Sequence, residues 1–335
     1  MPRITGGGLE VIVVDDGSQD GTAEKVRTMM PGDRRLRVLS QANQGKARAL
    51  ERGFRDASFG VLVTLDADTQ FQRDTVAELV APFVDGRVGA VSGHAKVGNR
   101  RRFIARCQAL EYACGFNLDR QAYAALNCIT VVPGAVGAYR REAVRAIGGM
   151  KSDTLAEDTD LTLELHRAGY RVDYAPRAIA WTEAPETFSA LARQRFRWCF
   201  GTMQCLWKHR DMVFDPRRGA LGNFSLPGIW FFQVVLVALV PLVDVLLLIS
   251  IIAGDGGAML IYFLVFLLAD FILALLGCLL EKEPWHRSLL ILPMRVLYRP
   301  LLSWVVWKSL HRALQGVFVE WGKLERKGTV EVQGV

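Results

Sequence analysis

The stretch Val61-Leu62-Val63-Thr64-Leu65-Asp66-Ala67-Asp68 joins a short apolar run to two acids. The same arrangement occurs earlier, where Glu10–Val14 is followed by Asp15-Asp16-Gly17-Ser18. Such runs have the length and β-branched content of buried strands in a parallel sheet. Because an open α/β sheet binds its ligand beyond the carboxyl ends of its strands, the acids of both stretches are expected at the ligand-binding edge.

Strand-like and helix-like segments alternate around this stretch, which predicts an α/β fold with a mostly parallel, Rossmann-like sheet covered on both faces. The expected strands are 10–14, 36–39, 61–65, 88–92, 129–132, 138–140, 171–174 and 178–181, the last two as edge strands. The expected helices are 22–30, 45–57, 73–83, 101–126, 157–168 and 187–208. The last helix is both basic and aromatic, as helices at a membrane interface are.

The C-terminal third of this 335-residue chain is far more apolar than the rest. Leu226–Ala253 and Ala258–Leu280 each exceed the ~20 residues that cross the hydrocarbon core of a bilayer. A third apolar stretch, Ser288–Trp307, contains Arg295 and Arg299. Because one arginine at mid-bilayer costs roughly 2.5–3.5 kcal/mol on insertion scales, this stretch is expected to be re-entrant or interfacial, with a third crossing as the alternative.

These features predict a multi-pass protein of the plasma membrane with a cytosolic folded domain. The expected boundaries are 1–212 for the folded domain, 213–225 for an interfacial linker, 226–253 and 258–280 for transmembrane helices, 288–310 for the re-entrant/interfacial or third transmembrane helix, and 311–335 for a cytosolic tail. Basic residues lie near 281–287 and in the tail, whereas the turn at 254–257 has none. The positive-inside rule therefore places residues 281–287 and the tail in the cytosol.

Charge and cysteine content exclude several classes of protein. The net charge of +7 fits contact with anionic lipid better than nucleic-acid binding, because the same chain carries membrane segments. Nucleic acid is therefore not expected as a partner. The six cysteines form no C-x-x-C pair and accompany no histidine cluster, which argues against a zinc site and a disulfide framework.

Two partial matches to other binding loops fail. An EF-hand calcium loop starting at Asp16 needs an acid at its twelfth position, which is Arg27 here. Asn43-Gln44-Gly45-Lys46 resembles the end of a P-loop, but the glycine required five residues before Gly45 is Ser40. Lys46 at a helix start is still a candidate for contact with a diphosphate, with a solvated lysine as the alternative.

Three further motifs are candidates for chemistry. Asp66 and Asp68 at a strand end suit Mg²⁺ or Mn²⁺, which takes one or two carboxylates and completes its shell with phosphate and water; an acidic surface turn is the alternative. Ala156-Glu157-Asp158 opens a helix, so its acids are either helix-dipole partners or supply a general base. In Gln194-Arg195-Phe196-Arg197-Trp198 the tryptophan offers a face to a sugar ring and the arginines can pair with phosphates, with an interfacial helix as the alternative.

The order of these motifs, D-D-G-S, D-x-D, E-D and Q-R-x-R-W before the membrane segments, resembles the processive members of glycosyltransferase family 2. This group contains the cellulose, chitin, hyaluronan and poly-N-acetylglucosamine synthases. The resemblance runs from Glu10 to about Val330 and includes Val132-Pro133-Gly134-Ala135 and the tail Trp321–Arg326. It implies a GT-A fold, a UDP-sugar donor, a Mg²⁺ or Mn²⁺ ion, and inverting transfer to a growing β-linked polysaccharide.

The resemblance also implies a role for each motif. Asp158 would be the catalytic base. The donor nucleotide would be bound by Asp15, Asp16, Lys46 and Asp66. The metal would be held by Asp68 together with Asp66, Asp68 being the direct ligand. The diphosphate and the acceptor end of the glycan would be held by Glu157, Gln194, Arg195, Arg197 and Trp198.

The family's strand before D-D-G-S and its upstream membrane segments have no counterpart before Glu10, so the chain is expected to be truncated at its N-terminus. Resemblance around Cys107–Asn127 and in the tail favours N-acetylglucosamine, in a β-1,6-linked product. The expected partners are the donor, the growing polysaccharide and the lipid bilayer, with export or accessory subunits as further candidates. The alternatives are a non-processive transferase acting on a lipid phosphate, a transporter or assembly subunit, and an inactive truncated fragment.

Overall fold

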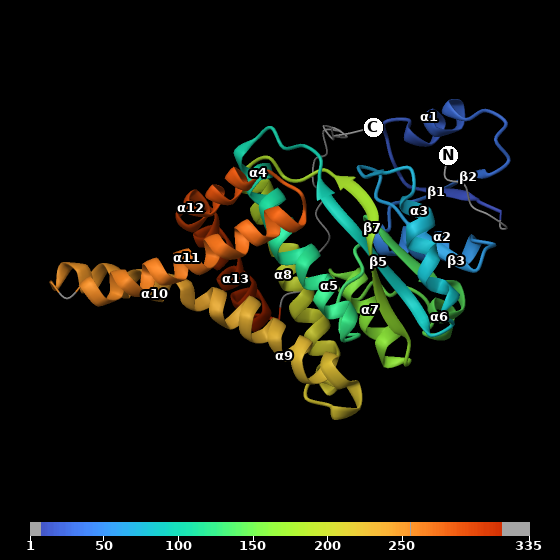
Figure 1. Cartoon of the computed structure of the whole chain (residues 1–335). Coiled ribbons are helices and arrows are strands. Elements are labelled where there is room, and N and C mark those ends of the chain that lie inside the picture. Colours follow the sequence, from blue (N-terminus) through green and yellow to red (C-terminus); the bar gives the residue numbers. More distant parts are fainter. Residues whose placement is uncertain (1–7, 255, 317–335) are drawn as a thin grey trace. The chain divides into compact units, whose positions relative to one another are not determined.

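A computed structural model of the chain describes residues 8–254 and 256–316. The chain divides into two compact units, shown with their labelled elements in Figure 1. The first unit contains Met1–His94 and Ile129–Ala180, and the second contains Ala95–Cys128 and Trp181–Val335. The tail motif Trp321–Arg326 lies outside the described residues.

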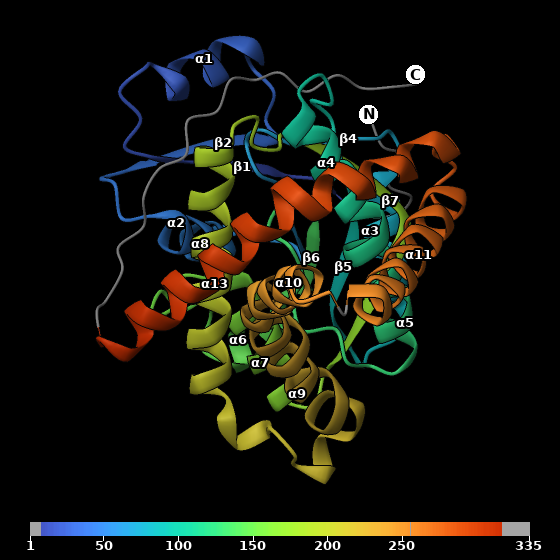
Figure 2. The same ribbon diagram turned by 90° about the vertical axis from the view of Figure 1, so that its left-hand side faces the viewer.

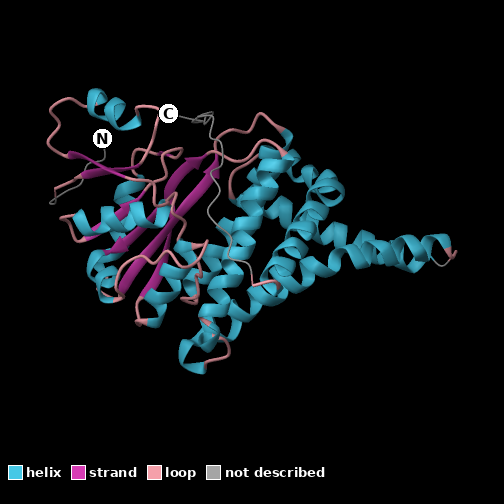
Figure 3. Ribbon diagram, turned by 180° about the vertical axis from the view of Figure 1, so that it is seen from behind, coloured by secondary structure: helices cyan, strands magenta, loops and turns pink. Residues whose placement is uncertain are grey.

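The first unit has an α/β architecture, and its strands are coloured magenta in Figure 3. β1 (Val11–Asp16) pairs in parallel with β2 (Leu36–Gln41). A five-stranded sheet has the order β3-β6-β5-β7-β4. Its strands are β3 (Val61–Thr64), β4 (Gln70–Phe71), β5 (Val88–Val97), β6 (Gly137–Arg140) and β7 (Arg171–Thr182). The helices are α1 (Thr22–Met29), α2 (Lys46–Asp56), α3 (Thr75–Val80), the 3-10 turn η1 (Ala81–Val84), α6 (Arg141–Ala146) and α7 (Glu157–Arg167).

The sheet is mixed. The expected parallel pairing is present between β1 and β2, but β6 runs antiparallel to both β3 and β5. Apolar periodicity identifies a strand without giving its direction, because the same alternation serves both kinds of ladder. The direction of β6 therefore follows from the path of the chain before it.

Two strand predictions are wrong in detail. Ile129–Val132 forms no strand, because side chains of α7 bond its backbone: Thr162 Oγ1 accepts from Val132 N at 3.0 Å, and His166 Nε2 lies 2.8 Å from Ile129 O. The two predicted edge strands are one strand, β7, which lies between β5 and β4. Pro176 is tolerated there because it is exposed and the neighbouring β4 has only two residues.

The second unit is helical. The predicted helix at 101–126 is α4 (Phe103–Glu111), the π-helical turn η2 (Tyr112–Asn117) and α5 (Leu118–Ala125). Next come α8 (Phe188–Lys208) and the short 3-10 turns η3 (Arg210–Met212) and η4 (Pro216–Arg218). The C-terminal part consists of η5 (Leu221–Ser225), α9 (Leu226–Gly228), η6 (Ile229–Val235), α10 (Leu236–Ile252), α11 (Gly256–Leu280), η7 (Trp285–Leu290), α12 (Ile291–Pro293), η8 (Met294–Tyr298) and α13 (Arg299–Leu314).

Three of these helical stretches are long and apolar enough to cross a membrane: Leu221–Ile252, Met259–Leu280 and Trp285–Leu314. Their apolar side chains are largely exposed on α10 and α11, as expected of surfaces that face lipid. The third stretch packs differently, because α13 contacts both α8 and α10, and Figure 2 shows it running across α8. Lys308 of α13 lies over the ring of Phe196 of α8, 5.3 Å from its centroid.

Arg295 and Arg299 of the third stretch are paired with an acid of the second. Arg295 Nη1 lies 3.0 Å and Arg299 Nη2 lies 2.9 Å from the same oxygen of Asp270. The guanidinium of Arg295 also stacks 4.4 Å from the ring centroid of Phe263. Because pairing offsets much of the cost of placing charge in apolar surroundings, these contacts fix α11 beside η8 and α13.

We expect Asp270→Asn to destabilise the helical unit by roughly 1–3 kcal/mol, because both arginines lose a charged partner. The loss is smaller than for a fully buried pair, since the three side chains are 16–33% exposed. The midpoint of unfolding in detergent measures this loss of stability. Asp244→Asn is the matched control, because Asp244 is an exposed acid of α10 with no ion pair among the described residues. Equal midpoints for the two variants would rule out a stabilising role for the ion pairs.

Candidate active site

The acids after β1 differ in what they contact. Asp15 is buried, and its Oδ1 accepts from the backbone N–H of Ser18 at 3.2 Å. The Asp16 carboxylate accepts three hydrogen bonds at 2.8–2.9 Å, from the backbone N–H groups of Gln44 and Gly45 and from Gln41 Nε2. Asp16 therefore holds the loop that leads into α2, and Lys46 is the first residue of that helix.

Glycines allow the two loops to approach each other. Gly17 has φ of 74°, and a Cβ built there would lie 2.9 Å from the backbone nitrogen of Asn43. Gly45 has φ of 89°, directly before the first residue of α2. Both conformations favour glycine.

Lys46 lies among acids from two other segments. Its Nζ is 2.7 Å from Asp66 Oδ1, after β3, and 3.9 Å from Glu157 Oε1, in the first turn of α7. Gly134 leaves room for it, because a Cβ at that position would lie 2.7 Å from Nζ. The structure thus brings together Lys46, Asp66 and the E-D motif, which are remote in sequence.

The charges of this cluster shift its pKa values. Burial lowers the pKa of Lys46, but the negative charges of Asp66, Glu157 and Asp158 outweigh this effect, so its pKa is raised. Burial and the neighbouring Asp158 raise the pKa of Glu157, against the opposing effect of Lys46. Burial also raises the pKa of Asp158, again opposed by Lys46. A carboxylate with a raised pKa is suited to accept a proton near neutral pH.

Local hydrogen bonds stabilise the first turn of α7 and the loop before Gly134. Asp158 Oδ1 accepts from Thr159 N at 2.8 Å. Thr162 Oγ1 donates to the Asp158 carbonyl at 2.7 Å. The buried Tyr139 donates to the Val132 carbonyl at 3.1 Å, so the loop before Gly134 is tied to β6. Because Glu157 and Asp158 lie in the first turn of α7, they are at the positive end of the helix dipole.

Asp66 and Asp68 lie on a tight turn closed by the hydrogen bond from Thr69 N to Asp66 O at 3.0 Å. Both carboxylates are half-buried. Carboxylate oxygens are the ligands that Mg²⁺ and Mn²⁺ prefer, so the donor set fits a divalent ion. Because Lys46 already pairs with Asp66, Asp68 is the better candidate for the direct ligand.

The Q-R-x-R-W residues belong to the second unit, on α8. Gln194 and Arg195 are buried, Arg197 is half-buried, and the side chain of Trp198 is exposed. Arg195 Nη2 lies 2.6 Å from Glu111 Oε2, and its guanidinium stacks 4.4 Å from the ring centroid of Trp198. Within the described residues, Gln194 Oε1 is buried without a hydrogen-bond partner.

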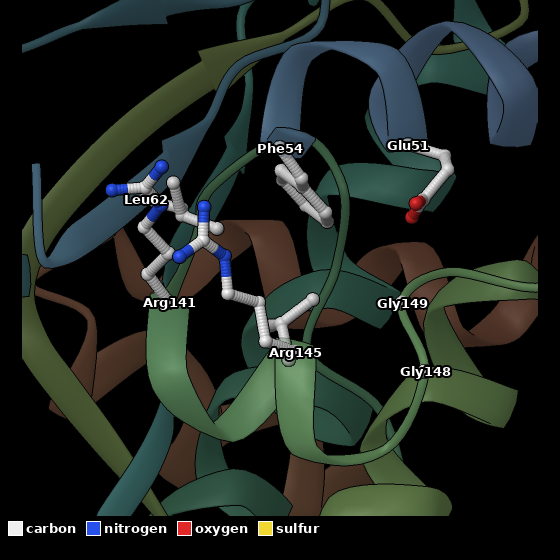
Figure 4. Close-up of a pocket in the computed structure, with 8 residues that line it drawn as sticks. Glu51, Phe54, Leu62, Arg141, Arg145, Gly148 and Gly149 are labelled. Carbon is white, nitrogen blue, oxygen red and sulfur yellow. The ribbon is translucent and has the colours of Figure 1, made fainter. Parts of the chain in front are cut away.

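A separate hollow of about 150 Å³ lies between α2 and α6 in the first unit (Figure 4). Glu51 and Phe54 line it from α2, and Arg141 and Arg145 line it from α6. Glu51 Oε2 accepts from Met150 N at 2.7 Å, which fixes the turn beside the hollow. None of the residues predicted from the motifs lines it.

Sequence reasoning missed several residues that shape these sites. Glu111 and Tyr298 hold Arg195, yet neither belongs to a motif and both are remote from α8 in sequence. No motif in the sequence indicated a role for Tyr139 either. Gly134 belongs to the V-P-G-A motif, but the motif does not indicate that the missing side chain leaves room for Lys46.

Comparison with solved structures identifies the fold. PcManGT, a mannosyltransferase from Pyrobaculum calidifontis in complex with GDP-Man and Mn²⁺, superposes with a TM-score of 0.62. The two chains are 22% identical, and the match covers 86% of this chain and 78% of that chain. The chain therefore has a GT-A glycosyltransferase fold with a mixed sheet, and the predicted fold class is confirmed.

The family follows from the sequence match. The family described as "Glycosyl transferase family group 2" matches residues 61–280, and the chain belongs to it. The poly-beta-1,6-N-acetyl-D-glucosamine synthase of Staphylococcus aureus (strain COL) is 30% identical over 210 residues, which is 62% of this chain and 51% of the relative. The synthase of the same name from Staphylococcus epidermidis is 30% identical over 198 residues, covering 59% of this chain and 48% of the relative. The chain thus spans about half the length of the curated relatives it matches.

We expect Asp16→Ala to release the loop before α2. The variant loses three hydrogen bonds to a carboxylate, each contributing roughly 1.5–3 kcal/mol at most, so the amides of Gln44 and Gly45 should exchange faster with deuterium. Hydrogen–deuterium exchange of a peptide covering 42–50 measures this. Asp20→Ala is the control, because the exposed Asp20 accepts its hydrogen bonds from Thr22 at the start of α1 and not from the loop before α2. Unchanged exchange in Asp16→Ala would contradict a loop-holding role.

Proposed function

We propose that this chain is the catalytic part of a membrane-bound, processive, inverting glycosyltransferase that extends a β-linked polysaccharide from a UDP-sugar. The observation that carries the proposal is the cluster of Lys46, Asp66, Glu157 and Asp158. It offers a cation for a leaving diphosphate next to a carboxylate with a raised pKa that can act as a base. Membership of glycosyl transferase family group 2 supports the same reaction class.

In the proposed reaction, Asp158 takes the proton of an acceptor hydroxyl while that oxygen attacks the anomeric carbon of the donor. The bond to the nucleoside diphosphate breaks, and the diphosphate leaves with the bonding electrons. Attack from the opposite face converts an α-linked donor into a β-linked product. Lys46 and Glu157 are assigned to the diphosphate, and Asp15 and Asp16 are assigned to the nucleoside side, Asp16 through the loop that it holds.

A divalent ion is assigned to the D-x-D turn. Asp68, together with Asp66, would hold Mg²⁺ or Mn²⁺, which neutralises the negative charge of the leaving diphosphate when bound. This assignment rests on the carboxylate donor set and on Lys46, whose charge already balances Asp66.

The acceptor is assigned to the Q-R-x-R-W helix, α8. Trp198 is exposed enough to offer its indole to a sugar ring, and Gln194 and Arg197 are assigned to polar groups of the acceptor or the diphosphate. The proposed sugar is N-acetylglucosamine, on the strength of the two staphylococcal relatives. The catalytic unit is placed on the cytosolic side of the plasma membrane, because UDP-sugars are cytosolic and the turn at 254–257 has no basic residue.

We expect Asp158→Asn to bind UDP as the wild type does but to lower the rate of sugar transfer by 10²–10⁴-fold, the usual contribution of a positioned base. Transfer of radiolabelled UDP-N-acetylglucosamine into polymer, with UDP binding in parallel, tests both parts. Asp153→Asn replaces an exposed acid shortly before α7 and should keep full activity. Wild-type turnover in Asp158→Asn would remove this residue from the mechanism. A product one sugar long, attached to a lipid phosphate, would favour the non-processive alternative.

We also expect excess EDTA and the substitution Asp68→Ala each to abolish transfer, because the leaving diphosphate then lacks its metal counter-charge. Activity should return when Mg²⁺ or Mn²⁺ is added to the EDTA-treated wild type but not to Asp68→Ala. Asp74→Ala serves as the control, since Asp74 lies directly before α3 outside the D-x-D turn. Full activity in EDTA would eliminate the metal from the reaction.

A further inference from the structure

Arg195 is the centre of a polar cluster inside the helical unit. Its Nη2 lies 2.6 Å from Glu111 Oε2 and 3.3 Å from the hydroxyl oxygen of Tyr298. Tyr298 in turn donates to the same Glu111 oxygen at 2.5 Å. The three residues come from α8, the end of α4 and η8, so the cluster joins three separate stretches of the chain.

Burial makes this cluster hard to open. Arg195 is 7% exposed and Tyr298 is 1% exposed. If the guanidinium turned away to a ligand, the Glu111 carboxylate would lose its cationic partner and keep only the hydrogen bond from Tyr298. Arg195 is therefore a poor candidate for a group that reaches out to a diphosphate.

The same guanidinium supports the one exposed aromatic ring of the motif. Its Cζ lies 4.4 Å from the ring centroid of Trp198, one helical turn further along α8. Phe116 of η2 packs its ring edge-on against the same indole, with the centroids 6.0 Å apart. Trp198 is nevertheless 37% exposed, so part of the indole stays open to a ligand. Arg195 and Phe116 thus determine where the open part of this ring lies.

We propose that Arg195 is a positioning residue and not a diphosphate ligand: clamped by Glu111 and Tyr298, it holds the Trp198 indole in place for the acceptor. The proposal rests on the proposed function in one respect, namely that Trp198 receives the acceptor end of the glycan. It replaces the role that the motif alone gave to Arg195.

A consequence concerns the third apolar stretch. Tyr298 belongs to η8, within the helical run Trp285–Leu314 that is long and apolar enough to cross a membrane. The Trp198 indole, which is proposed to receive the acceptor, is therefore held partly by a hydroxyl group from that stretch, acting through Arg195. Displacement of Tyr298 should weaken acceptor binding without a change in the donor site.

The test uses Tyr298→Phe in the full chain, because it removes one hydroxyl and keeps the ring. The first readout is acrylamide quenching of Trp198, taken as the difference between each chain and the same chain carrying Trp198→Phe. We expect quenching to increase, and KM for an added β-1,6-linked N-acetylglucosamine oligosaccharide to rise about 3- to 10-fold, with the donor KM unchanged. Tyr262→Phe, at an exposed tyrosine of α11, should match the wild type in both readouts.

A second pair of variants keeps the test decisive if Tyr298→Phe is poorly folded. Glu111→Gln and Arg195→Lys should both increase quenching of Trp198 while the Kd for UDP stays at the wild-type value. Wild-type quenching in all three variants would overturn the proposal. So would a weaker UDP affinity in Arg195→Lys with an unchanged acceptor KM, because that result makes Arg195 a diphosphate ligand. The quenching readout needs no turnover, so it decides the role of Arg195 even if the wild-type chain transfers no sugar and the proposed function fails.

Discussion

The ion pair between Lys46 and Asp66 is the contact on which the arrangement of the candidate active site depends. Asp66 follows β3, whereas Glu157 and Asp158 open α7, and three carboxylates in one partly buried place repel one another. A single ammonium group among them offsets this repulsion. The loop held by Asp16 and the missing side chain at Gly134 both serve to bring that ammonium group into place.

The same constraint organises the helical unit. A charged group in apolar surroundings needs a partner, and here the partner comes from a remote stretch of chain. Glu111 and Tyr298 hold Arg195 on α8. Asp270 of α11 pairs with two arginines of the following stretch, which holds that stretch beside α11. These polar contacts act together with an apolar core that joins the same helices, formed among others by Leu191, Ala274 and Met294.

Much of the fold was accessible from local patterns, and the failures have physical causes. The strands β1, β2, β3 and β5 and the long helices were predicted because apolar runs and helical periodicity are properties of neighbouring residues. Ile129–Val132 has a strand-like composition, but Thr162 and His166 of a later helix bond its backbone. The direction of β6 and the inner position of β7 depend on pairings with distant strands. No local window contains that information.

The sequence alone determined the family, the motif residues and the apolar stretches, because each is encoded in residue identity and short-range spacing. The tertiary structure decided which of those residues act together. It placed Lys46 against Asp66 and Glu157 and engaged Asp16 with a loop. It also paired the buried Arg195 with Glu111. The physical reason is that the environment of a charge is set by atoms brought to it through folding, and those atoms come from segments far away in the sequence.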